Sequence, residues 1–487
     1  MSNTRNSVCE CYSLLLLLLL RKANKRTKTK TKIKKENLFL VSLNLQKKKK
    51  KRFTQGQSNI VTMERLISHP PLMIVSDLDH TMVDHQDQQN LSLLRFNSLW
   101  EDAYRRDSLL VFSTARSPIL YKELRKEKPL LTPDIIITSI GTEIAFGNSM
   151  VPDHAWVETL NSDKWNREIV LEETRKFPEL TLQPKTEQRL HKVSFYIDEG
   201  KGEALTKELS QLLEKRGLDV KIIYSWGKNV DVIPRGAGKG EALEYLLKKL
   251  QAEGIFPVNT LACGDSEHDA ELFSIPDVHG VMVSNSQEEL LKWRSENALD
   301  NPKVIHSTER CADGIIQAIG HFKLGPNLSP RDVSEFLKRK RDTANPGQEV
   351  VRFYLFYERL RRGEINNYET YIASFKESCH QGAVFVHPSG AEKSLRDTID
   401  EVEMCYGDKR GKKFWVWVDQ VLVTDNNTPG KCIVKFAKWE QCEDERKCCT
   451  TTVEFTSKGG DLVWEKVNQI WSEDAEVKDD DNSRWIL

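Results

Sequence analysis

Short apolar runs alternate with longer amphipathic stretches between Leu72 and about Gly320. The short runs have the length of buried strands, and the longer ones repeat their apolar residues with a helical period. The clearest strands after 72–76 are predicted at 109–113, 135–139 and 260–264, and the clearest helices at 91–105, 119–126 and 240–253. This alternation predicts an α/β fold, a doubly wound parallel sheet with its ligand site at the carboxyl ends of the strands.

The pattern changes twice along the chain. Half-exposed strands at 193–197 and 220–224, with helices at 164–177 and 203–216, predict a small α+β insertion, which we call the cap. Beyond 324–327, helices at 332–341, 350–362 and 367–379 precede strands at 414–423, 431–439 and 451–455, which predicts a C-terminal α+β domain. The expected domains are a leader at 1–62, a core at 63–146 and 235–322, a cap at 147–234 and a C-terminal domain at 327–487.

The distribution of charged residues along the chain limits which kinds of partner it can bind. Residues 1–62 carry 16 Lys and Arg against two acids, whereas the remainder carries 56 basic and 70 acidic residues. An acidic body disfavours nucleic acid as the main partner. We interpret the basic leader as a disordered extension before a natural start at Met63, with a nuclear-targeting or nucleic-acid patch as the alternative.

Membrane insertion and secretion are both disfavoured. The apolar run Leu14–Leu20 is too short to span a bilayer, and the basic residues mostly follow it instead of preceding it. The ten cysteines show no C-x-x-C pair of a zinc site. These observations predict a cytoplasmic protein with no membrane partner.

Two carboxylates follow the first predicted strand, at Asp77 and Asp79. Positions i and i+2 of a strand project to the same side, so both side chains can reach one site. Two anions that close require a cation or a shared proton. One carboxylate could attack phosphorus while the other moves protons, with Mg²⁺ screening the phosphate charge. The motif therefore predicts metal-assisted phosphoryl chemistry.

Three further segments carry polar residues at predicted strand ends or helix starts. Hydroxyls and a guanidinium could hold phosphate oxygens, an ammonium could neutralise the attacking carboxylate, and two acids could complete a hard-cation site. These residues are Ser113, Thr114 and Arg116, then Lys239 within Gly236–Gly240, then Asp265 and Asp269. The glycine-rich stretch is not a P-loop, because Gly240 follows the lysine. Each segment alone is weak evidence for a phosphoryl-transfer site. Their occurrence in this order, at strand ends and helix starts, indicates that they form one site.

Together with the segments 139–143, 236–240 and 264–273, these motifs resemble the haloacid-dehalogenase superfamily of phosphatases. More narrowly, the chain from about Met63 to its end is similar to the plant sucrose-phosphate phosphatases, including their C-terminal domain. The resemblance implies a Mg²⁺-dependent enzyme that hydrolyses sucrose 6-phosphate to sucrose and phosphate, the last step of sucrose biosynthesis.

The resemblance also implies catalytic roles. Asp77 would be the nucleophile that forms an aspartyl-phosphate, and Asp79 the general acid and then the base. Mg²⁺ would be held by the side chains of Asp77 and Asp265 and the backbone carbonyl of Asp79. Lys239 would hold the phosphoryl group. Asp269 would support either the metal or Lys239.

Substrate contacts are implied for a second set of residues. Thr114 and Ser113 would lie at the phosphoryl group and Arg116 would reach the substrate. In the cap, Lys192 and Tyr224 would touch the sugar, with surface or packing roles as the alternative.

Two segments depart from the family pattern. Ala115 stands where glycine is usual, and Glu267-His268 replace Gly-Asn, so His268 would change the charge near substrate and metal. Because alanine lacks the freedom of glycine at positive φ, we expect a slightly reshaped phosphate loop. From both departures together we expect activity that is retained but weakened.

The alternatives are a phosphatase of another sugar phosphate, and a weakly active paralogue that binds sucrose-phosphate synthase. A homodimer is a further partner hypothesis.

Overall fold

The structure, a computed structural model, describes residues 68–161, 164–198, 200–333, 345–425, 428–472 and 485–487. The predicted leader at 1–62 and most of the predicted helix at 332–341 lie outside these residues.

The core is an eight-stranded sheet in the order β12-β11-β10-β1-β2-β3-β4-β5. Neighbours from β12 to β3 are parallel, and β4 and β5 extend the sheet as antiparallel strands. Its strands are β1 (Met73–Ser76), β2 (Leu109–Ser113), β3 (Ile135–Thr138), β4 (Glu143–Phe146), β5 (Val151–Pro152), β10 (Thr260–Gly264), β11 (Val278–Met282) and β12 (Val304–His306). The strand order reverses at β1 and β10, so a crevice forms at their carboxyl ends. The predicted α/β class is confirmed.

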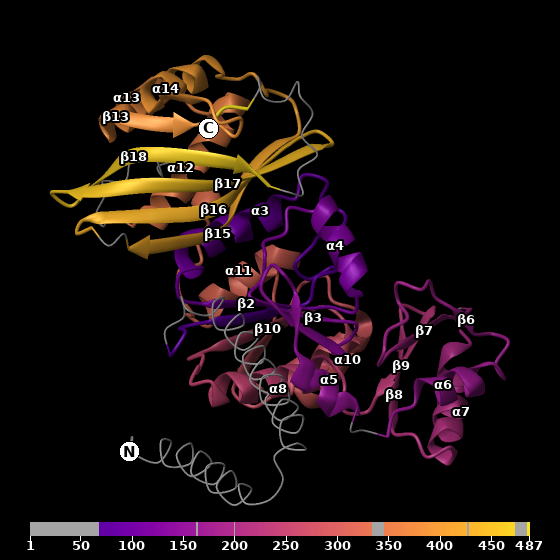
Figure 1. The fold of residues 1–487 in the computed structure, drawn as a ribbon. Coiled ribbons are helices and arrows are strands. Elements are labelled where there is room, and N and C mark those ends of the chain that lie inside the picture. The colour runs from indigo at the N-terminus through magenta and orange to yellow at the C-terminus, as the bar shows by residue number, and fades with distance from the viewer. Residues whose placement is uncertain (1–67, 162–163, 199, 334–344, 426–427, 473–484) are drawn as a thin grey trace, which may run out of the picture. The chain divides into compact units, whose positions relative to one another are not determined.

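Helices cover both faces of this sheet (Figure 1). On one face, Phe96, Leu124 and Ile315 share a buried core with Ile74 and Phe112 of the sheet. The helices are α3 (Leu91–Leu99), α4 (Pro118–Glu127) and α11 (Cys311–His321) on that face, and α8 (Lys239–Ala252), α9 (Ala270–Phe273) and α10 (Glu288–Asn297) elsewhere around the sheet. The predicted helix 91–105 is α3 followed by a π-helical turn, Trp100–Tyr104.

The cap is a four-stranded antiparallel sheet with two helices. Its elements are α6 (Arg167–Thr174), β6 (Thr181–Leu182), β7 (Val193–Tyr196), α7 (Gly202–Lys215), β8 (Val220–Ser225) and β9 (Asn229–Pro234). Strand β9 was not predicted. The insertion also begins later than residue 147, because β5 pairs with β4 of the core sheet. Helix α5 (His154–Asn161) stays with the core, since the indole of Trp156 donates a hydrogen bond to the Gly141 carbonyl.

The C-terminal domain is a six-stranded sheet in the order β14-β13-β18-β17-β16-β15, packed with three helices (Figure 1). Its elements are α12 (Pro346–Arg362), α13 (Tyr368–Glu377), β13 (Cys379–Val386), β14 (Glu392–Ser394), α14 (Leu395–Met404), β15 (Phe414–Asp425), β16 (Lys431–Cys442), β17 (Glu445–Lys458) and β18 (Asp461–Trp471). The predicted helices α12 and α13 and the predicted strands β15, β16 and β17 are present, but β13, β14, α14 and β18 were not predicted. Because α14 lies between β14 and β15, the order is not simply helices followed by strands. Trp464 is fully buried against Phe353, Phe375 and Phe455.

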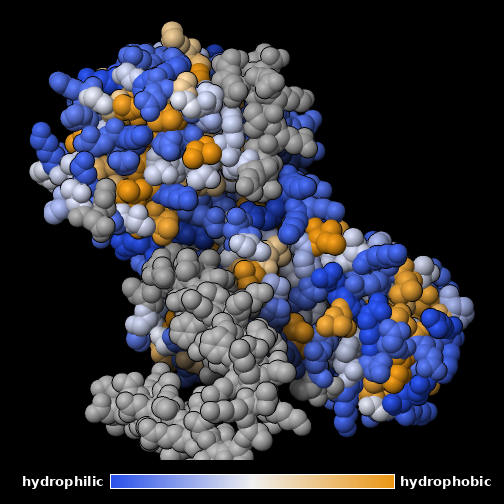
Figure 2. All heavy atoms as spheres, in the orientation of Figure 1, coloured by the Kyte–Doolittle hydropathy of each residue, from blue (hydrophilic) through white to orange (hydrophobic). Residues whose placement is uncertain are grey.

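Figure 2 shows hydrophilic residues over most of the visible face, with hydrophobic residues in small separate groups. Among the described residues, no helix is long and apolar enough to cross a bilayer.

We predict that Trp464→Ala destabilises the C-terminal domain by about 3–5 kcal/mol, because it removes a large side chain from the centre of the aromatic cluster. Chemical denaturation followed by tryptophan fluorescence measures this. Ile470→Ala on the same strand is the control, because Ile470 is 59% exposed. Equal losses for the two variants would contradict the described core.

Candidate active site

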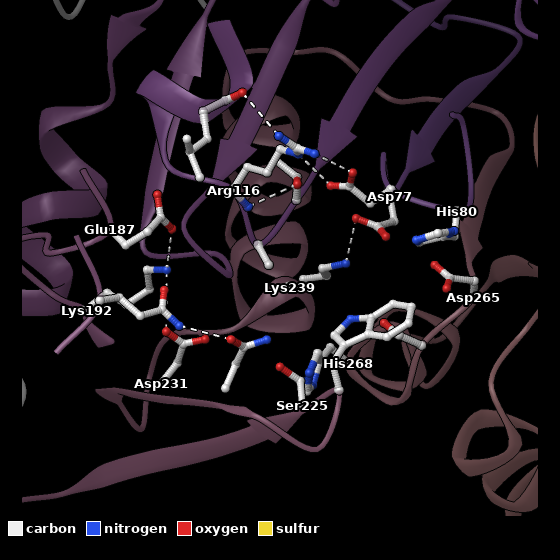
Figure 3. A pocket seen from close by; sticks show the side chains of 18 of the residues that line it. Asp77, His80, Arg116, Glu187, Lys192, Ser225, Asp231, Lys239, Asp265 and His268 are labelled. Atoms are coloured by element: carbon white, nitrogen blue, oxygen red, sulfur yellow. Dashed lines mark hydrogen bonds and ion pairs between the residues drawn. The ribbon is translucent and has the colours of Figure 1, made fainter. Parts of the chain in front are cut away.

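Loops at the carboxyl ends of β1, β2 and β10 and the start of α8 surround a cavity of about 390 Å³, and the cap supplies its other wall. In Figure 3, Asp77, Lys239 and Asp265 point into the same space that Lys192 and Asp231 reach from the cap. This is the edge of the sheet at which a ligand site was predicted.

Lys239 is the buried cation of this site. Its ammonium lies 3.0 Å from a carboxylate oxygen of Asp77 and 2.7 Å from one of Asp269, and all three residues are buried. Burial lowers the pKa of Lys239, but the carboxylates of Asp269 and Asp77 more than offset this and raise it. The lysine therefore stays charged and compensates the two acids.

Glycines allow these segments to approach one another. A Cβ on Gly264 would lie 2.2 Å from the Cβ of Asp269, so only glycine lets that carboxylate turn back beneath β10. A Cβ on Gly141, where φ is +82°, would lie 2.0 Å from the Gly238 carbonyl oxygen just before α8. Both contacts bring residues distant in sequence to the position of Lys239.

Asp77, Asp265 and Asp269 form a cluster of acids, and the single positive charge of Lys239 does not balance all of their negative charge. One carboxylate oxygen from each of Asp77, Asp265 and Asp269 lies within 4.8 Å of the others. Burial is the main cause that raises the pKa of Asp77, and burial with the charge of Asp269 raises that of Asp265 to about 7. Such raised values mean that the cluster favours another positive charge, so its oxygens fit a hard divalent cation.

Asp269 contributes to the cluster from a fixed position. Its Oδ1 accepts from Lys239, and its Oδ2 accepts from the backbone N–H groups of Asp265 and Ser266 and from the Ser266 hydroxyl. Thr81 donates to Asp265 Oδ1. Because the oxygens of Asp269 are already engaged, Asp77 and Asp265 are better placed to bind a metal.

Asp79 accepts hydrogen bonds from two basic side chains. Arg116 donates from Nε to Oδ2 at 2.7 Å and from Nη2 to Oδ1 at 2.8 Å, and His85 Nε2 lies 2.7 Å from Oδ1. Burial would raise the pKa of Asp79, but the hydrogen bonds from His85 and Arg116 hold it well below its usual range. Asp79 is therefore ionised in this structure.

The cap places a second buried lysine opposite these acids. Lys192 donates to Glu187 at 3.1 Å and lies 3.5 Å from Asp231, which also accepts from Ser194 at 2.5 Å. Gln183 and Asn229 hydrogen-bond to each other beside them, at 3.1 Å. The cap wall therefore offers charged and amide groups suited to hydroxyl-rich ligands.

Most of the predicted site residues meet in this cavity. Those lining it are Asp77, Asp79, Thr114, Arg116, Lys192, Lys239, Asp265 and His268. Thr114 Oγ1 accepts from the Arg116 N–H, and burial, followed by the charge of Lys239, lowers the pKa of His268.

Three predicted residues lie behind the cavity wall. Asp269 sits beneath Lys239 as described, and Ser113 is buried within β2. The hydroxyl of Tyr224 donates to the Gly227 carbonyl, and its ring packs with the apolar core of the cap.

Sequence reasoning missed several lining residues. His80, His85, Glu187, Trp226 and Asp231 all line the cavity. The rings of His80, from the core, and Trp226, from the cap, lie 5.2 Å apart. Asp231 carried a usable signal, since it is a lone acid within the apolar strand pattern that becomes β9.

Ala115 does not use the backbone freedom that distinguishes glycine. Ala115 lines the cavity but is not among the residues with positive φ, so alanine adopts this backbone without the penalty that glycine would avoid. Its methyl group alone distinguishes it from glycine here.

Comparison with known proteins gives consistent matches. A family profile described as "Sucrose-6F-phosphate phosphohydrolase" matches residues 70–323, and its C-terminal counterpart, "Sucrose-6-phosphate phosphohydrolase C-terminal", matches residues 346–473. The chain is 91% identical over 425 residues to "Probable sucrose-phosphatase 3b" of Arabidopsis thaliana, covering 87% of this chain and 100% of the relative. It is 61% identical over 429 residues to "Sucrose-phosphatase 1" of Nicotiana tabacum, with the same coverage.

Among solved structures, the sucrose-phosphatase of Synechocystis sp. PCC6803, solved with sucrose and phosphate, is 32% identical. The structural alignment covers 52% of this chain and 98% of the Synechocystis chain, with a TM-score of 0.47.

We predict that the metal-free protein loses stability as pH rises from about 4 through 7, because the raised pKa of Asp265 favours the proton more in the folded state than in the unfolded state. Asp265→Asn should flatten this dependence in thermal melts with a chelator present. Asp277→Asn is the control, because that carboxylate is 94% exposed. An unchanged pH slope in Asp265→Asn would contradict the predicted titration.

Proposed function

The chain belongs to the sucrose-6F-phosphate phosphohydrolase family, and we propose that it hydrolyses sucrose 6-phosphate to sucrose and phosphate through an aspartyl-phosphate on Asp77. The observation that carries this proposal is the convergence of Asp77, Asp79, Lys239 and Asp265 on one cavity. The family and the 91% identical sucrose-phosphatase relative support the substrate.

In the first proposed step, a carboxylate oxygen of Asp77 attacks phosphorus and the bond from phosphorus to the sugar oxygen breaks. Asp79, which is ionised in the free site, would take up one proton from solvent when the substrate binds and give it to the leaving oxygen, so the sugar departs as an alcohol. Lys239, 3.0 Å from Asp77, reduces the repulsion between the carboxylate and the phosphate. Thr114 and Arg116 lie on the same wall and would hold the phosphoryl oxygens.

In the second proposed step, Asp79 takes a proton from water as the water oxygen bonds to phosphorus. The bond from phosphorus to Asp77 breaks, which frees phosphate and restores the carboxylate. The hydrogen bonds from Arg116 and His85 hold Asp79 ionised, which is the state that this base requires.

We propose Mg²⁺ as the cofactor, held by the side chains of Asp77 and Asp265 and the backbone carbonyl of Asp79. When bound, it would neutralise phosphate charge at the attacked phosphorus. The support is the buried cluster of acids and the raised pKa of Asp265.

We propose that the cap selects the sugar through Lys192, Glu187 and Asp231. Their charged groups line the same cavity as Asp77, on the cap side, where a sugar attached to the phosphoryl group would have room to lie. A site that hydrogen-bonds hydroxyls discriminates strongly, because an analogue lacking them leaves buried polar groups unpaired.

Location and protein partners remain predictions. A cytoplasmic location agrees with eight described cysteines that are all free. Binding to sucrose-phosphate synthase and formation of a homodimer are hypotheses from the sequence resemblance.

We predict that Asp77→Asn lowers phosphate release from sucrose 6-phosphate by at least about 10³-fold, because the amide is a far weaker nucleophile. The same assay with a chelator should abolish wild-type activity, and added Mg²⁺ should restore it. Asp277→Asn is the matched control on the surface. If Asp77→Asn kept near wild-type turnover, or wild type released no phosphate, the proposal would fail.

We predict that Lys192→Met raises the KM for sucrose 6-phosphate by about tenfold while turnover of p-nitrophenyl phosphate changes little, because only the sugar reaches the cap wall. Fructose 6-phosphate and trehalose 6-phosphate complete the substrate panel. Lys201→Met, on the exposed part of the cap, is the control. Equal losses on both substrates would show that Lys192 supports the fold and does not select the sugar.

A further inference from the structure

Helix α4 connects the active site to the C-terminal domain. Arg116 lies two residues before the first residue of α4 and binds Asp79, and Ser117 between them caps the helix by accepting the Leu120 N–H. A ten-residue helix is about 15 Å long, so its other end lies well outside the cavity. The two ends of α4 therefore belong to different environments.

Helix α4 buries few of its side chains. Of its ten residues, Tyr121 and Leu124 are buried, and both belong to the core beside the sheet. A helix this short is marginal by itself, and the carbonyls of its last turn lack partners within the helix. What binds those carbonyls therefore helps to set the tilt of α4.

Arg446, at the start of β17, binds the last carbonyls of α4. Its guanidinium donates to the carbonyls of Arg125 at 2.8 Å, Lys128 at 3.2 Å and Glu127 at 3.2 Å. A cation at the C-terminal end of a helix also interacts favourably with the helix dipole. Burial, followed by the charge of Arg125, lowers the pKa of Arg446 to about 10, which leaves it protonated at neutral pH.

The C-terminal domain holds this guanidinium from two sides. Gln441 accepts from Arg446 Nη2 at 2.7 Å, and the guanidinium carbon lies 5.2 Å from the ring centre of Trp417. Trp417 itself is buried and stacks in parallel on Trp439, at 5.6 Å. Arg446 is therefore fixed by β15 and β16 before it meets α4.

A second contact fixes the segment that follows α4. Asp419, buried in β15, accepts from the Thr132 N–H at 3.0 Å and from the Thr132 hydroxyl at 2.6 Å. Thr132 in turn accepts from Arg125 in the last turn of α4, at 2.7 Å. Both ends of the loop from α4 to β3 thus contact the C-terminal domain.

We propose that Arg446 is a positioning residue of the active site: by binding the C-terminal end of α4, it fixes where the helix places Arg116 against Asp79. The inference rests on the proposed function only in that Arg116 and Asp79 take part in phosphoester hydrolysis. This role of Arg446 would let the C-terminal domain affect catalysis, although no residue of that domain lines the cavity among the described residues.

The test compares Arg446→Met with Arg331→Met by steady-state kinetics. Arg331 also joins the two parts, since it donates to Ser98 of α3 and to the Val416 carbonyl, but α3 carries none of the cavity residues. We expect Arg446→Met to lower kcat/KM by about tenfold and Arg331→Met by less than about twofold, because small displacements of reacting groups are costly. Arg446→Lys keeps the positive charge but loses the planar guanidinium with its several N–H donors, so it should give an intermediate kcat/KM.

A double-mutant cycle separates positioning from general destabilisation. In an Arg116→Ala background, Arg446→Met should lower kcat/KM by less than about a further twofold, because the residue through which it acts is gone. The proposal is overturned if the full loss persists in that background, or if Arg331→Met and Arg446→Met act alike. If Arg446→Met fails to fold in thermal melts, Gln441→Leu replaces it, because it releases the guanidinium without removing it.

All variants are assayed on sucrose 6-phosphate and on p-nitrophenyl phosphate. If wild type hydrolyses only the second substrate, the proposed function fails while the cycle on that substrate still tests Arg446. If wild type hydrolyses the first and the cycle shows no coupling, the positioning role alone is wrong.

Discussion

One buried cation makes the active site possible. The ammonium of Lys239 lies between Asp77 and Asp269, in a place where burial alone would penalise every charge. Without it, the two acids would have to take up protons or remain in water, because unpaired buried charges are among the costliest features of a protein interior. Gly264, which lets Asp269 turn back beneath β10, and Gly141, which lets its turn approach the start of α8, both serve this contact.

The distribution of charge around this lysine separates the two key aspartates. Burial raises the pKa of Asp77, whereas His85 and Arg116 lower that of Asp79. Carboxylates only two residues apart thus experience opposite environments. Arg116 in turn depends on α4, and α4 on the domain that contains Arg446.

The core of the site was predictable from sequence because its residues follow strands of one sheet. Asp77, Thr114, Lys239 and Asp265 each sit at a strand end or helix start, so the parallel topology alone brings them together. His85, Glu187 and Arg446 were not predictable, because their partners lie in segments whose local pattern carries no sign of the contact. Asp419 and Thr132, separated by 287 positions, meet only after the C-terminal sheet has formed.

The central claim is that Asp77 attacks phosphorus, and covalent trapping tests it most directly. Enzyme mixed with sucrose 6-phosphate and Mg²⁺ would be quenched in acid, reduced with borohydride and digested, and the peptide containing Asp77 and Asp79 would be sequenced by mass spectrometry. Attack by Asp77 would lead to conversion of Asp77 to homoserine, with Asp79 unmodified. Modification of Asp79 alone, or substrate turnover with no modified carboxylate, would contradict it.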